Sequence, residues 1–312
     1  MNPASLSELR TTFGDRMQEN VPLSGYTAAR IGGPADALVF VRKADELVQA
    51  AEKLWKMDMP FILLGGGSNV LVSDRGVRGV VIINRARLLK FKHSQNGTTS
   101  PTDPPTVYAE TGVTPNDIAQ RAARLGLAGF EWAASIPGSL GGAIYGNAGA
   151  FGGDIAGNLI SVELFHRQYG RQTWPVSKLE YGYRSSLLKR KHPPVVILSA
   201  ELALKYGNRP DILSKMEQFS SQRRTSQPPG ASMGSIFMNP PGDNAGRLLE
   251  AAGLKGKSIG NATVSTQHAN FFINNGQTRA EDMRGLIELA QKTVLDQFGI
   301  KLEPEVELIG EW

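Results

Sequence analysis

The sequence predicts a protein of mixed helices and strands that is divided into two or three domains. Its 312 residues are enough for more than one sizeable core. Some segments repeat apolar residues at helical spacing, whereas others contain short apolar runs typical of strands. The pattern changes after about Lys205, where turns and helices replace the glycine-rich strands.

The part before Lys205 is predicted to consist of strands joined by helices and glycine loops. A turn at 30–34 precedes the first strand, and Thr114 and Pro115 have the positions of an N-cap and a first helical residue. The polar segment 93–106 is predicted to be an exposed loop. The predicted strands are 37–41, 61–64, 70–72, 77–83, 107–112, 159–165 and 195–204, and the predicted helices are 44–56 and 115–125.

The part after Lys205 contains longer helices and a charged final strand. Thr278 and Glu281 have capping-box spacing, and Gly299 is placed to end the helix that they open. The final segment alternates apolar residues with Glu303, Glu305 and Glu307. We predict helices at 212–224, 243–252 and 278–298, and strands at 232–240, 269–273 and 300–309.

Composition excludes several kinds of site. The chain has no cysteine, so it has no disulfide, thiolate zinc site or cysteine nucleophile, and its four histidines lack metal-motif spacing. The net charge of +5 comes without long basic runs, so an anionic small substrate is favoured over nucleic acid. A signal peptide and a membrane-length apolar run are both absent from the sequence, so we expect a cytoplasmic protein without a membrane partner.

A stretch of unusual glycine density, 135–153, is the centre of the sequence. Glycine stands at seven of these positions and alternates with apolar residues, which argues against a flexible linker. Because glycine costs backbone entropy on folding, such density indicates turns of positive φ or backbone lying against a ligand. The stretch alone leaves two alternatives open, a backbone wrapped around a flat polar cofactor and a glycine-rich turn region.

A second glycine loop, 65–69, follows a buried strand. Successive amides in such a loop can converge on a phosphate, although a simple strand-to-strand turn is the alternative. The loop matches neither the dinucleotide fingerprint nor a P-loop. Segment 251–258, AAGLKGKS, resembles a P-loop, but Ala251 replaces the first glycine and a helix precedes it, so a helix end and a basic turn explain it better.

Arg184, Ser235 and one glutamate of the final segment could take part in catalysis or binding, but the sequence alone leaves their roles open. Arg184 could clamp a carboxylate with two parallel hydrogen bonds, or it could be an exposed arginine. Ser235 could be a structural turn hydroxyl, and without a nucleophile elbow or a histidine base near it the sequence argues against a hydrolase. Strand periodicity cannot choose among Glu303, Glu305 and Glu307.

Taken together and in order, these segments resemble the UDP-N-acetylenolpyruvoylglucosamine reductase family (MurB, also called UDP-N-acetylmuramate dehydrogenase), flavoenzymes of bacterial peptidoglycan precursor synthesis. The resemblance covers residues 26–310. The motifs that carry it are GGGSNVLVSD, SIPGSLGGAIYGNAGAFGGDI, YRSS, GSIFMNP, HANFFIN and LEPEVELIG.

The resemblance implies an α+β fold with the FAD-binding architecture of vanillyl-alcohol oxidases. It implies two FAD-binding subdomains at 1–85 and 86–205, a substrate-binding domain at 206–300, and a C-terminal strand at 301–312 that returns toward the active site. The implied protein is a monomer that binds FAD without a covalent bond and uses NADPH as hydride donor.

The implied reaction reduces the enolpyruvyl ether of UDP-N-acetylglucosamine-enolpyruvate to a lactyl ether, giving UDP-N-acetylmuramate. NADPH reduces FAD and leaves before the sugar nucleotide enters the same cleft. Arg184 would bind the substrate carboxylate, Ser235 would supply the proton, and Glu305 would support this network. The implied cofactor contacts are Gly65, Gly66, Gly67, Ser68, Asn69, Ser135, Ile136, Pro137, Gly138, Gly142, Asn147, Gly149 and Ala150. The implied substrate contacts are Tyr183, Arg224, Asn239, His268 and Asn270.

The sequence departs from one form of the family, which carries an additional tyrosine-bearing loop over the substrate. Little room for that loop exists between Arg184 and Ser235, so the chain resembles the shorter form. Two alternatives are a flavin-dependent oxidase of the same fold acting on a small alcohol and a non-catalytic nucleotide-sugar sensor. Neither glycine loop has a neighbouring histidine to tether a flavin, as such an oxidase commonly does, and a sensor would not need Arg184, Ser235 and Glu305 together.

Overall fold

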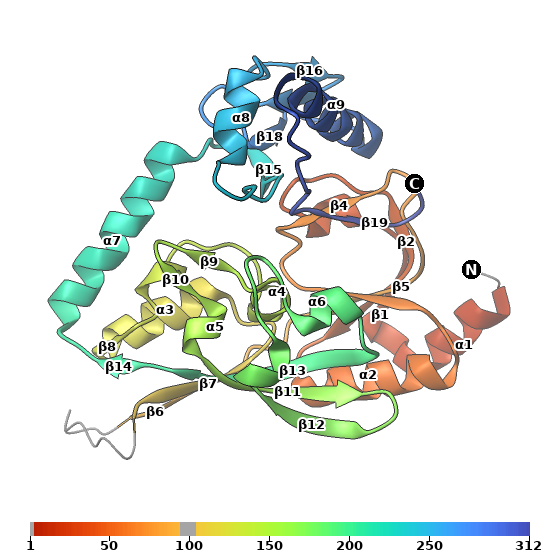
Figure 1. Cartoon of the computed structure of the whole chain (residues 1–312). Coiled ribbons are helices and arrows are strands. Elements are labelled where there is room, and N and C mark those ends of the chain that lie inside the picture. Colours follow the sequence, from red (N-terminus) through yellow and green to blue (C-terminus); the bar gives the residue numbers. More distant parts are fainter. Residues whose placement is uncertain (1–2, 94–103) are drawn as a thin grey trace. The chain divides into compact units, whose positions relative to one another are not determined.

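The computed structural model describes residues 3–93 and 104–312. The chain forms two compact units, each built from separate segments of sequence (Figure 1). The first unit contains 1–39, 66–81 and 223–312, and the second contains 40–65 and 82–222. The chain passes between them within β2 (Pro34–Val41), in the glycine loop, within β5 (Val77–Asn84) and within α7 (Arg209–Ser226).

The second unit is organised around an antiparallel sheet of the order β12-β11-β13-β7-β6. Its strands are β12 (Gly170–Pro175), β11 (Leu159–His166), β13 (Val195–Ala203), β7 (Thr106–Glu110) and β6 (Leu89–Lys92). Helix α2 (Ala44–Lys56) packs against β13, and Trp55 at its end stacks on Phe165 of β11 at 5.8 Å. The apolar stripe predicted for this helix is therefore the face that it buries, with Leu47 and Leu54 fully covered.

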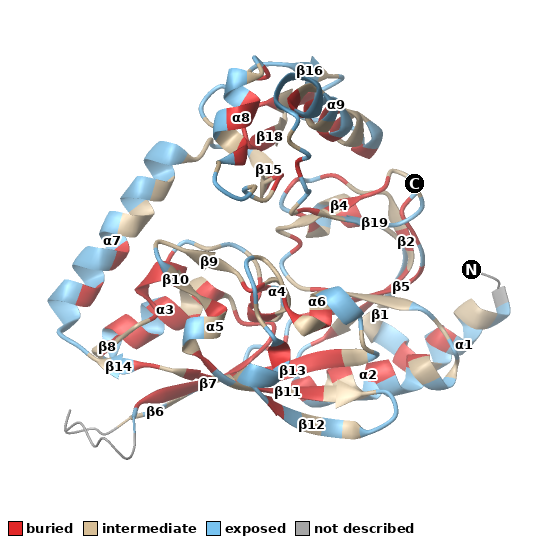
Figure 2. Cartoon of the chain, viewed as in Figure 1, coloured by how far each residue is buried: buried red, intermediate tan, exposed pale blue. Residues whose placement is uncertain are grey.

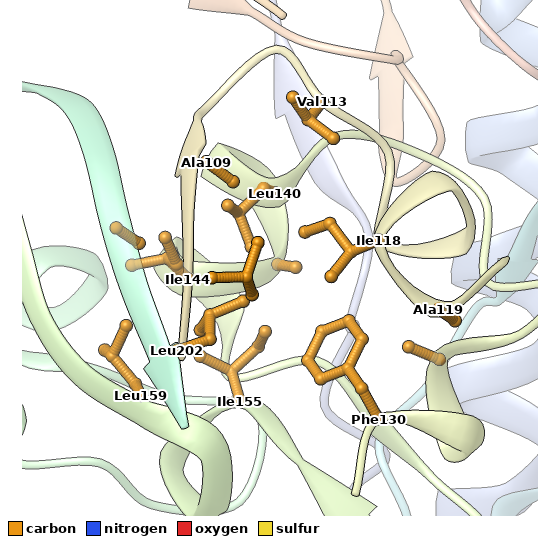
Figure 3. Packing of buried hydrophobic residues seen from close by; sticks show 14 of the residues in the cluster. Ala109, Val113, Ile118, Ala119, Phe130, Leu140, Ile144, Ile155, Leu159 and Leu202 are labelled. Carbon is orange, nitrogen blue, oxygen red and sulfur yellow. The ribbon is translucent and has the colours of Figure 1, made fainter. Parts of the chain in front are cut away.

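The core of the second unit joins the sheet to short helices and hairpins. Figure 3 shows Ile118, Phe130 and Ile144 converging on one another in this core. The short elements around this core are α3 (Pro115–Arg124), β8 (Leu127–Ala128), α4 (Leu140–Gly146), β9 (Gly149–Ala150), β10 (Gly153–Asp154), α5 (Ile155–Asn158), α6 (Leu187–Lys191) and β14 (Lys205–Tyr206). Strand β3 (Phe61–Leu64) also belongs to this unit. In contrast, α7 buries only Ile212 and Met216 along its 18 residues (Figure 2).

A buried carboxylate holds α2 in place. The Glu110 side chain is 6% exposed, and its two oxygens accept hydrogen bonds from the backbone N–H groups of Ala44 (2.9 Å) and Leu88 (2.7 Å). Ala44 is the first residue of α2, so the carboxylate also faces the positive end of the helix dipole. Glu110, at the end of β7, therefore acts as an N-terminal cap of α2.

Replacing Glu110 by alanine is expected to lower the free energy of unfolding by about 1–3 kcal/mol, because a helix-terminal amide and a partly buried amide lose their acceptor. Urea unfolding followed by tryptophan fluorescence would measure the change. Glu52→Ala, on the exposed face of the same helix, is the control and should stay within about 0.5 kcal/mol of the parent. Equal effects of the two substitutions would contradict the capping role of Glu110.

The first unit contains a four-stranded antiparallel sheet, one parallel strand pair, and part of a second sheet of the order β1-β2-β5-β3. The sheet has the order β15 (Ala231–Ser235), β18 (Phe271–Asn274), β17 (Ala262–Val264), β16 (Ser258–Ile259), and α9 (Ala280–Phe298) packs on β16 and β17. Strand β1 (Met17–Pro22) pairs antiparallel with β2, and β4 (Val70–Val72) pairs parallel with β19 (Glu307–Ile309). Helices α1 (Pro3–Phe13) and α8 (Ala245–Ala251) complete the regular elements of this unit. Its core includes Phe237, Phe272 and Leu286.

Most predicted elements are confirmed within four residues at each end, but the strand predicted at 232–240 ends five residues early, at Ser235. The Thr114 hydroxyl accepts a hydrogen bond from the Asp117 amide at 3.0 Å and opens α3 as predicted, and Gly299 ends α9 with φ +68°. The elements that the sequence interpretation missed include α1, β1, β6, α4, α5, β12, α6 and β17. Predicted loop residues 94–103 lie outside the described residues, and the division into three domains stays a prediction.

Two predictions about the C-terminal part are wrong. The capping box of Thr278 and Glu281 does not form, since α9 starts at Ala280 and the Asp74 carboxylate accepts the amides of Ala280 (2.8 Å) and Glu281 (3.1 Å). The final strand covers only 307–309 instead of 300–309, because only these residues pair with β4. Leu308, on the apolar face of the predicted alternation, is 45% exposed.

Candidate functional site

The glycine loop that connects β3 to β4 has a backbone that only glycine allows at its third position. Gly67 has φ +58°, and a Cβ atom there would lie 2.1 Å from the Tyr26 carbonyl oxygen. The Ala28 amide donates to the Gly67 carbonyl at 2.9 Å, and the Thr27 hydroxyl closes the turn through Ile31. Segment 26–31 therefore supports Gly67 from one side.

The amides of this loop fit an anionic group such as the pyrophosphate of FAD. Across residues 3–93 and 104–312, the backbone N–H groups of Gly66, Gly67 and Ser68 have no hydrogen-bond acceptor. Gly66 is exposed and Ser68 half-buried. Successive amides without protein acceptors in a left-handed turn form a nest that favours phosphate oxygens.

Replacing Gly67 by alanine is expected to lower FAD occupancy of the purified protein several-fold, because the methyl group would push the loop off Tyr26. The ratio of flavin absorbance to protein absorbance would measure it. Gly14→Ala is a matched control, since Gly14 has a similar φ of +51° but no atom within 4 Å of the place that a Cβ would take. Full flavin content in the Gly67 variant would contradict the assignment of this loop.

The glycine-rich stretch in the second unit starts where the Ser139 side chain lies tightly against the backbone of Gly65. A Cβ atom on Gly65 would lie 1.9 Å from the Ser139 hydroxyl oxygen, so the end of β3 lies directly against the start of α4. Ser139 caps α4 by accepting the Gly142 amide at 3.3 Å, and Leu140 and Gly141 donate to the carbonyls of Val113 and Thr111. Gly142 is exposed and has no side chain, so its backbone atoms form the outer surface of this turn.

Residues 135–138 form an exposed ridge ahead of α4. Ser135 has φ +69° and donates its amide to the Asn116 side chain at 3.1 Å, and Ile136 packs on the core. Within the part of the chain that the structure describes, the amides of Gly138 and Ser139 have no protein acceptor. These amides are available to a hydrogen-bonding cofactor, and the contact of this ridge with a cofactor stays a prediction.

Asn147 organises the second half of the stretch from inside the protein. Its side chain is 5% exposed, accepts the Ala156 amide at 3.0 Å and donates to the Gly182 carbonyl at 3.1 Å. Its φ of +48° ends α4. Gly149 and Ala150 follow in the β9–β10 hairpin, where a Cβ on Gly149 would lie 2.7 Å from the Cβ of Asp154. The Asn147 side chain therefore forms its hydrogen bonds within the protein, and its contact with a cofactor stays a prediction.

Arg184 is fixed beside this hairpin. It lies in a reciprocal turn between Gly182 and Ser185, has φ +52°, and donates from Nη2 to the Gly149 carbonyl at 3.1 Å. The exposed ring of Tyr183 lies 5.3 Å from the guanidinium carbon. The left-handed backbone of Arg184 is strained and its side chain is oriented by a carbonyl of the glycine stretch. Such strain is typical of functional sites.

In the first unit, Ser235 follows a β-bulge. The pairing of β15 with β18 shifts register between Ser232 and Ser235, and Gly234 has φ +77°. Such a bulge changes the direction of the side chain that follows it. The half-buried Ser235 is thereby set at the end of β15, opposite Phe271.

The structure places the Glu305 backbone beside Ile236, the residue that follows Ser235. The Glu305 amide donates to the carbonyl of Ile236 at 2.8 Å, and the Met238 amide donates to the carbonyl of Glu303 at 2.9 Å. The Asn69 side chain donates to the Glu305 carbonyl at 2.9 Å. Ser235, Glu305 and Asn69 therefore form one connected group in the first unit, whereas Arg184 belongs to the second.

The residues predicted to contact substrate have different surroundings. Both ends of the buried Asn270 amide bind the backbone of Phe237, at 2.9 and 2.8 Å, so Asn270 fixes the segment after Ser235. Asn239 accepts the first amide of α8, at Ala245, at 3.0 Å. Arg224 is exposed in the last turn of α7.

His268 is half-buried, and burial lowers the pKa of its imidazole, with Lys255 adding to the effect and Glu250 opposing it. The Asn270 amide donates to Nδ1 of His268 at 3.2 Å, which places the proton of the neutral ring on Nε2. His268 can therefore donate a hydrogen bond from Nε2.

Sequence reasoning missed two residues that shape the site. Ser139 sits three residues before Gly142, a spacing that signals a helix start, but the glycine content of the segment concealed it. Asn116, inside the predicted helix 115–125, gives no local signal for its contact with Ser135. Among the described residues, no helix combines the length and apolarity needed to cross a bilayer, and no three His, Asp or Glu side chains gather as a metal site would need.

Comparison with known proteins finds two family models along the chain. A model described as FAD binding domain matches residues 35–171, and a model described as UDP-N-acetylenolpyruvoylglucosamine reductase, C-terminal domain, matches residues 225–309. The first covers the two glycine loops and the second covers Ser235 and Glu305. The α+β fold with an FAD-binding domain is therefore confirmed.

Relatives of similar length match nearly the whole chain. A UDP-N-acetylenolpyruvoylglucosamine reductase from Chloroflexus aggregans is 40% identical over 296 residues, covering 94% of this chain and 97% of the relative. One from Synechococcus elongatus is 42% identical over 300 residues, covering 96% of each. The crystal structure of the enzyme from Thermus caldophilus aligns with a TM-score of 0.76 at 34% identity, covering 94% of this chain and 99% of that one.

Proposed function

Since the chain belongs to the UDP-N-acetylenolpyruvoylglucosamine reductase family, we propose that it reduces UDP-N-acetylglucosamine-enolpyruvate to UDP-N-acetylmuramate for peptidoglycan synthesis. It is a flavin oxidoreductase with an FAD-binding domain. The observation that carries the substrate assignment is the joined placement of Ser235 and Glu305 in the domain that matches the C-terminal family model. NADPH is the proposed hydride donor.

The chain's residues would hold FAD through backbone more than through side chains. The free amides of Gly66, Gly67 and Ser68 suit the pyrophosphate, and the ridge 135–138 with exposed Gly142 suits the ring system. Gly65, Asn69, Asn147, Gly149 and Ala150 complete the proposed binding set. When bound, FAD supplies the hydride that adds to the terminal carbon of the enolpyruvyl group.

Arg184 is proposed to bind the substrate carboxylate. Its guanidinium offers parallel N–H donors that match two carboxylate oxygens, and it cannot lose its charge at neutral pH. Negative charge moves toward this carboxylate as the hydride adds, so the interaction strengthens in the transition state. The hydrogen bond to Gly149 and the tight turn orient the side chain before the substrate arrives.

Ser235 is proposed to give its hydroxyl proton to the carbon next to the one that receives the hydride. A serine hydroxyl is a weak acid, so the transfer needs a strongly basic acceptor and a fixed position. The bulge at Gly234 and the buried Ile236 supply that position. Glu305 is proposed to support the network around this proton, and Tyr183, Arg224, Asn239, His268 and Asn270 to bind or order the rest of the substrate.

We also propose that the enzyme acts as a cytoplasmic monomer, with FAD held by residues 1–205, the sugar nucleotide by 206–300, and 301–312 returning toward the active site. The contact of Glu305 with Ile236 and the pairing of β19 with β4 support the last of these assignments.

The reaction can be tested by anaerobic spectroscopy of the purified flavoprotein. NADPH should bleach the visible absorption band of the flavin, and UDP-N-acetylglucosamine-enolpyruvate should restore it. A band restored by oxygen but not by the sugar nucleotide would favour the flavin oxidase. A colourless protein that does not take up FAD would contradict both assignments.

A further inference from the structure

The geometry points to Asn69 as a positioning residue that holds Glu305 in its reactive place and ties it to the cofactor loop. This inference rests on the proposed function and adds a role that a cofactor contact does not include. It starts from the short C-terminal strand. β19 begins only at Glu307, so the backbone of Glu305 lies outside the β4–β19 ladder.

Asn69 extends that ladder with its side chain. Its carbonyl accepts the Glu307 amide at 3.0 Å, and its Nδ2 donates to the Glu305 carbonyl at 2.9 Å. The main chain and side chain of one residue therefore bind two alternate residues of the C-terminal segment. Because alternate residues of an extended chain face the same way, Asn69 continues the pairing that Val70 begins.

The other side of the Glu305 peptide is held from the Ser235 segment. The Glu305 amide donates to the Ile236 carbonyl at 2.8 Å, and the Asn270 side chain fixes Phe237. The backbone of Glu305 is thus held at its N–H by the residue after Ser235 and at its C=O by Asn69. Loss of the Asn69 donor would leave one of these two restraints and allow the Glu305 carboxylate to move relative to Ser235.

Asn69 also ends the loop whose amides fit the FAD pyrophosphate. Gly66, Gly67 and Ser68 lie directly before it in the chain. The position of the cofactor loop is therefore transmitted to Glu305 through a single residue. This connection predicts that Asn69 acts on the sugar half-reaction, which needs Glu305, more than on flavin reduction by NADPH.

The test replaces Asn69 by aspartate, which keeps its size but sets an acceptor oxygen against the Glu305 carbonyl, and by alanine, which only removes the donor. The holoenzyme is reduced anaerobically with NADPH and then mixed rapidly with UDP-N-acetylglucosamine-enolpyruvate at several pH values. We expect reoxidation to slow by about 10- to 100-fold and its pH profile to shift, because misplacement of a reacting group by about 1 Å can cost about 100-fold in rate. Flavin reduction by NADPH should change by less than about threefold.

A matched control is Asn261→Asp, because Asn261 also donates from Nδ2 to a backbone carbonyl, that of Gly276, at 2.9 Å in the same unit. It should leave both half-reactions near the parent rates. A second comparison repeats Asn69→Ala in a Glu305→Gln background, where the further slowing should be less than about threefold if Asn69 acts through Glu305.

Three results would overturn the inference: equal slowing of both half-reactions, full additivity with Glu305→Gln, or an effect no larger than that of Asn261→Asp. Failure of the proposed function has a separate sign, since reduced parent enzyme would then not be reoxidised by the sugar nucleotide at all. Melting temperatures of all variants show whether a loss reflects unfolding of the β4–β19 pair.

Discussion

Replacing Ser235 by alanine is expected to slow reoxidation of the reduced enzyme by the sugar nucleotide by roughly 100- to 10,000-fold, the range of a lost general acid. The rate of flavin reduction by NADPH should stay near that of the parent, because this step needs no proton from Ser235. Stopped-flow absorbance of the two half-reactions measured separately gives both numbers.

Ser232→Ala is the control for this experiment. Ser232 lies on the same strand, β15, before the bulge, and pairs with Ile273 of β18. Its removal should leave both half-reactions unchanged within about twofold. Equal slowing of the two half-reactions by Ser235→Ala would refute the role of Ser235 as the proton donor.

Replacing Arg184 by alanine is expected to slow the sugar half-reaction by roughly 100- to 1,000-fold, the size of effect seen when one electrostatic donor to a developing charge is removed. FAD content should remain high, because the amides proposed to hold the cofactor are backbone groups. Arg184→Lys keeps the charge but loses the paired donors, so it should recover only part of the rate.

Arg190→Ala tests whether any arginine near this turn would have the same effect. Arg190 donates to Ser185 and to Glu180, at 3.0 Å each, from the neighbouring helix α6. Its loss should change the sugar half-reaction by less than about threefold. An Arg184→Ala protein purified without FAD would show instead that the hydrogen bond to Gly149 mainly supports the glycine stretch.

Local signals in the sequence were sufficient for most elements. The helix at 115–124 carries its own cap in Thr114 and its own first-turn proline, so neighbouring residues determine where it starts. Helix α4 was missed because glycine is a poor helix former. Its helical state depends on tertiary contacts, with Leu140 and Ile144 fully buried in the core of the second unit.

Helix and strand ends that depend on residues far away in the sequence could not be predicted from local patterns. The cap of α9 is Asp74, which lies 206 residues from Ala280. The late start of β19 follows from the three-residue length of β4. For the site, glycine density indicated either a ligand cradle or tight turns at both loops and did not choose between them. The choice of Glu305 came only from resemblance to a family, because alternation along 300–309 treats Glu303, Glu305 and Glu307 alike.

The parallel pair of β4 and β19 has a consequence for the folding of the chain during synthesis. Asn69 and Glu305 are separated by 236 residues, so β4 leaves the ribosome long before its partner exists. At a translation rate of about 5–20 residues per second, β4 and the cofactor loop before it remain without β19 for some tens of seconds. The second unit contains none of the segment after residue 222 and can form during that interval. The first unit can complete its fold only after its C-terminal segment has been synthesised. Its folding is therefore expected to be slow, because contacts between residues far apart in sequence require closure of a long loop.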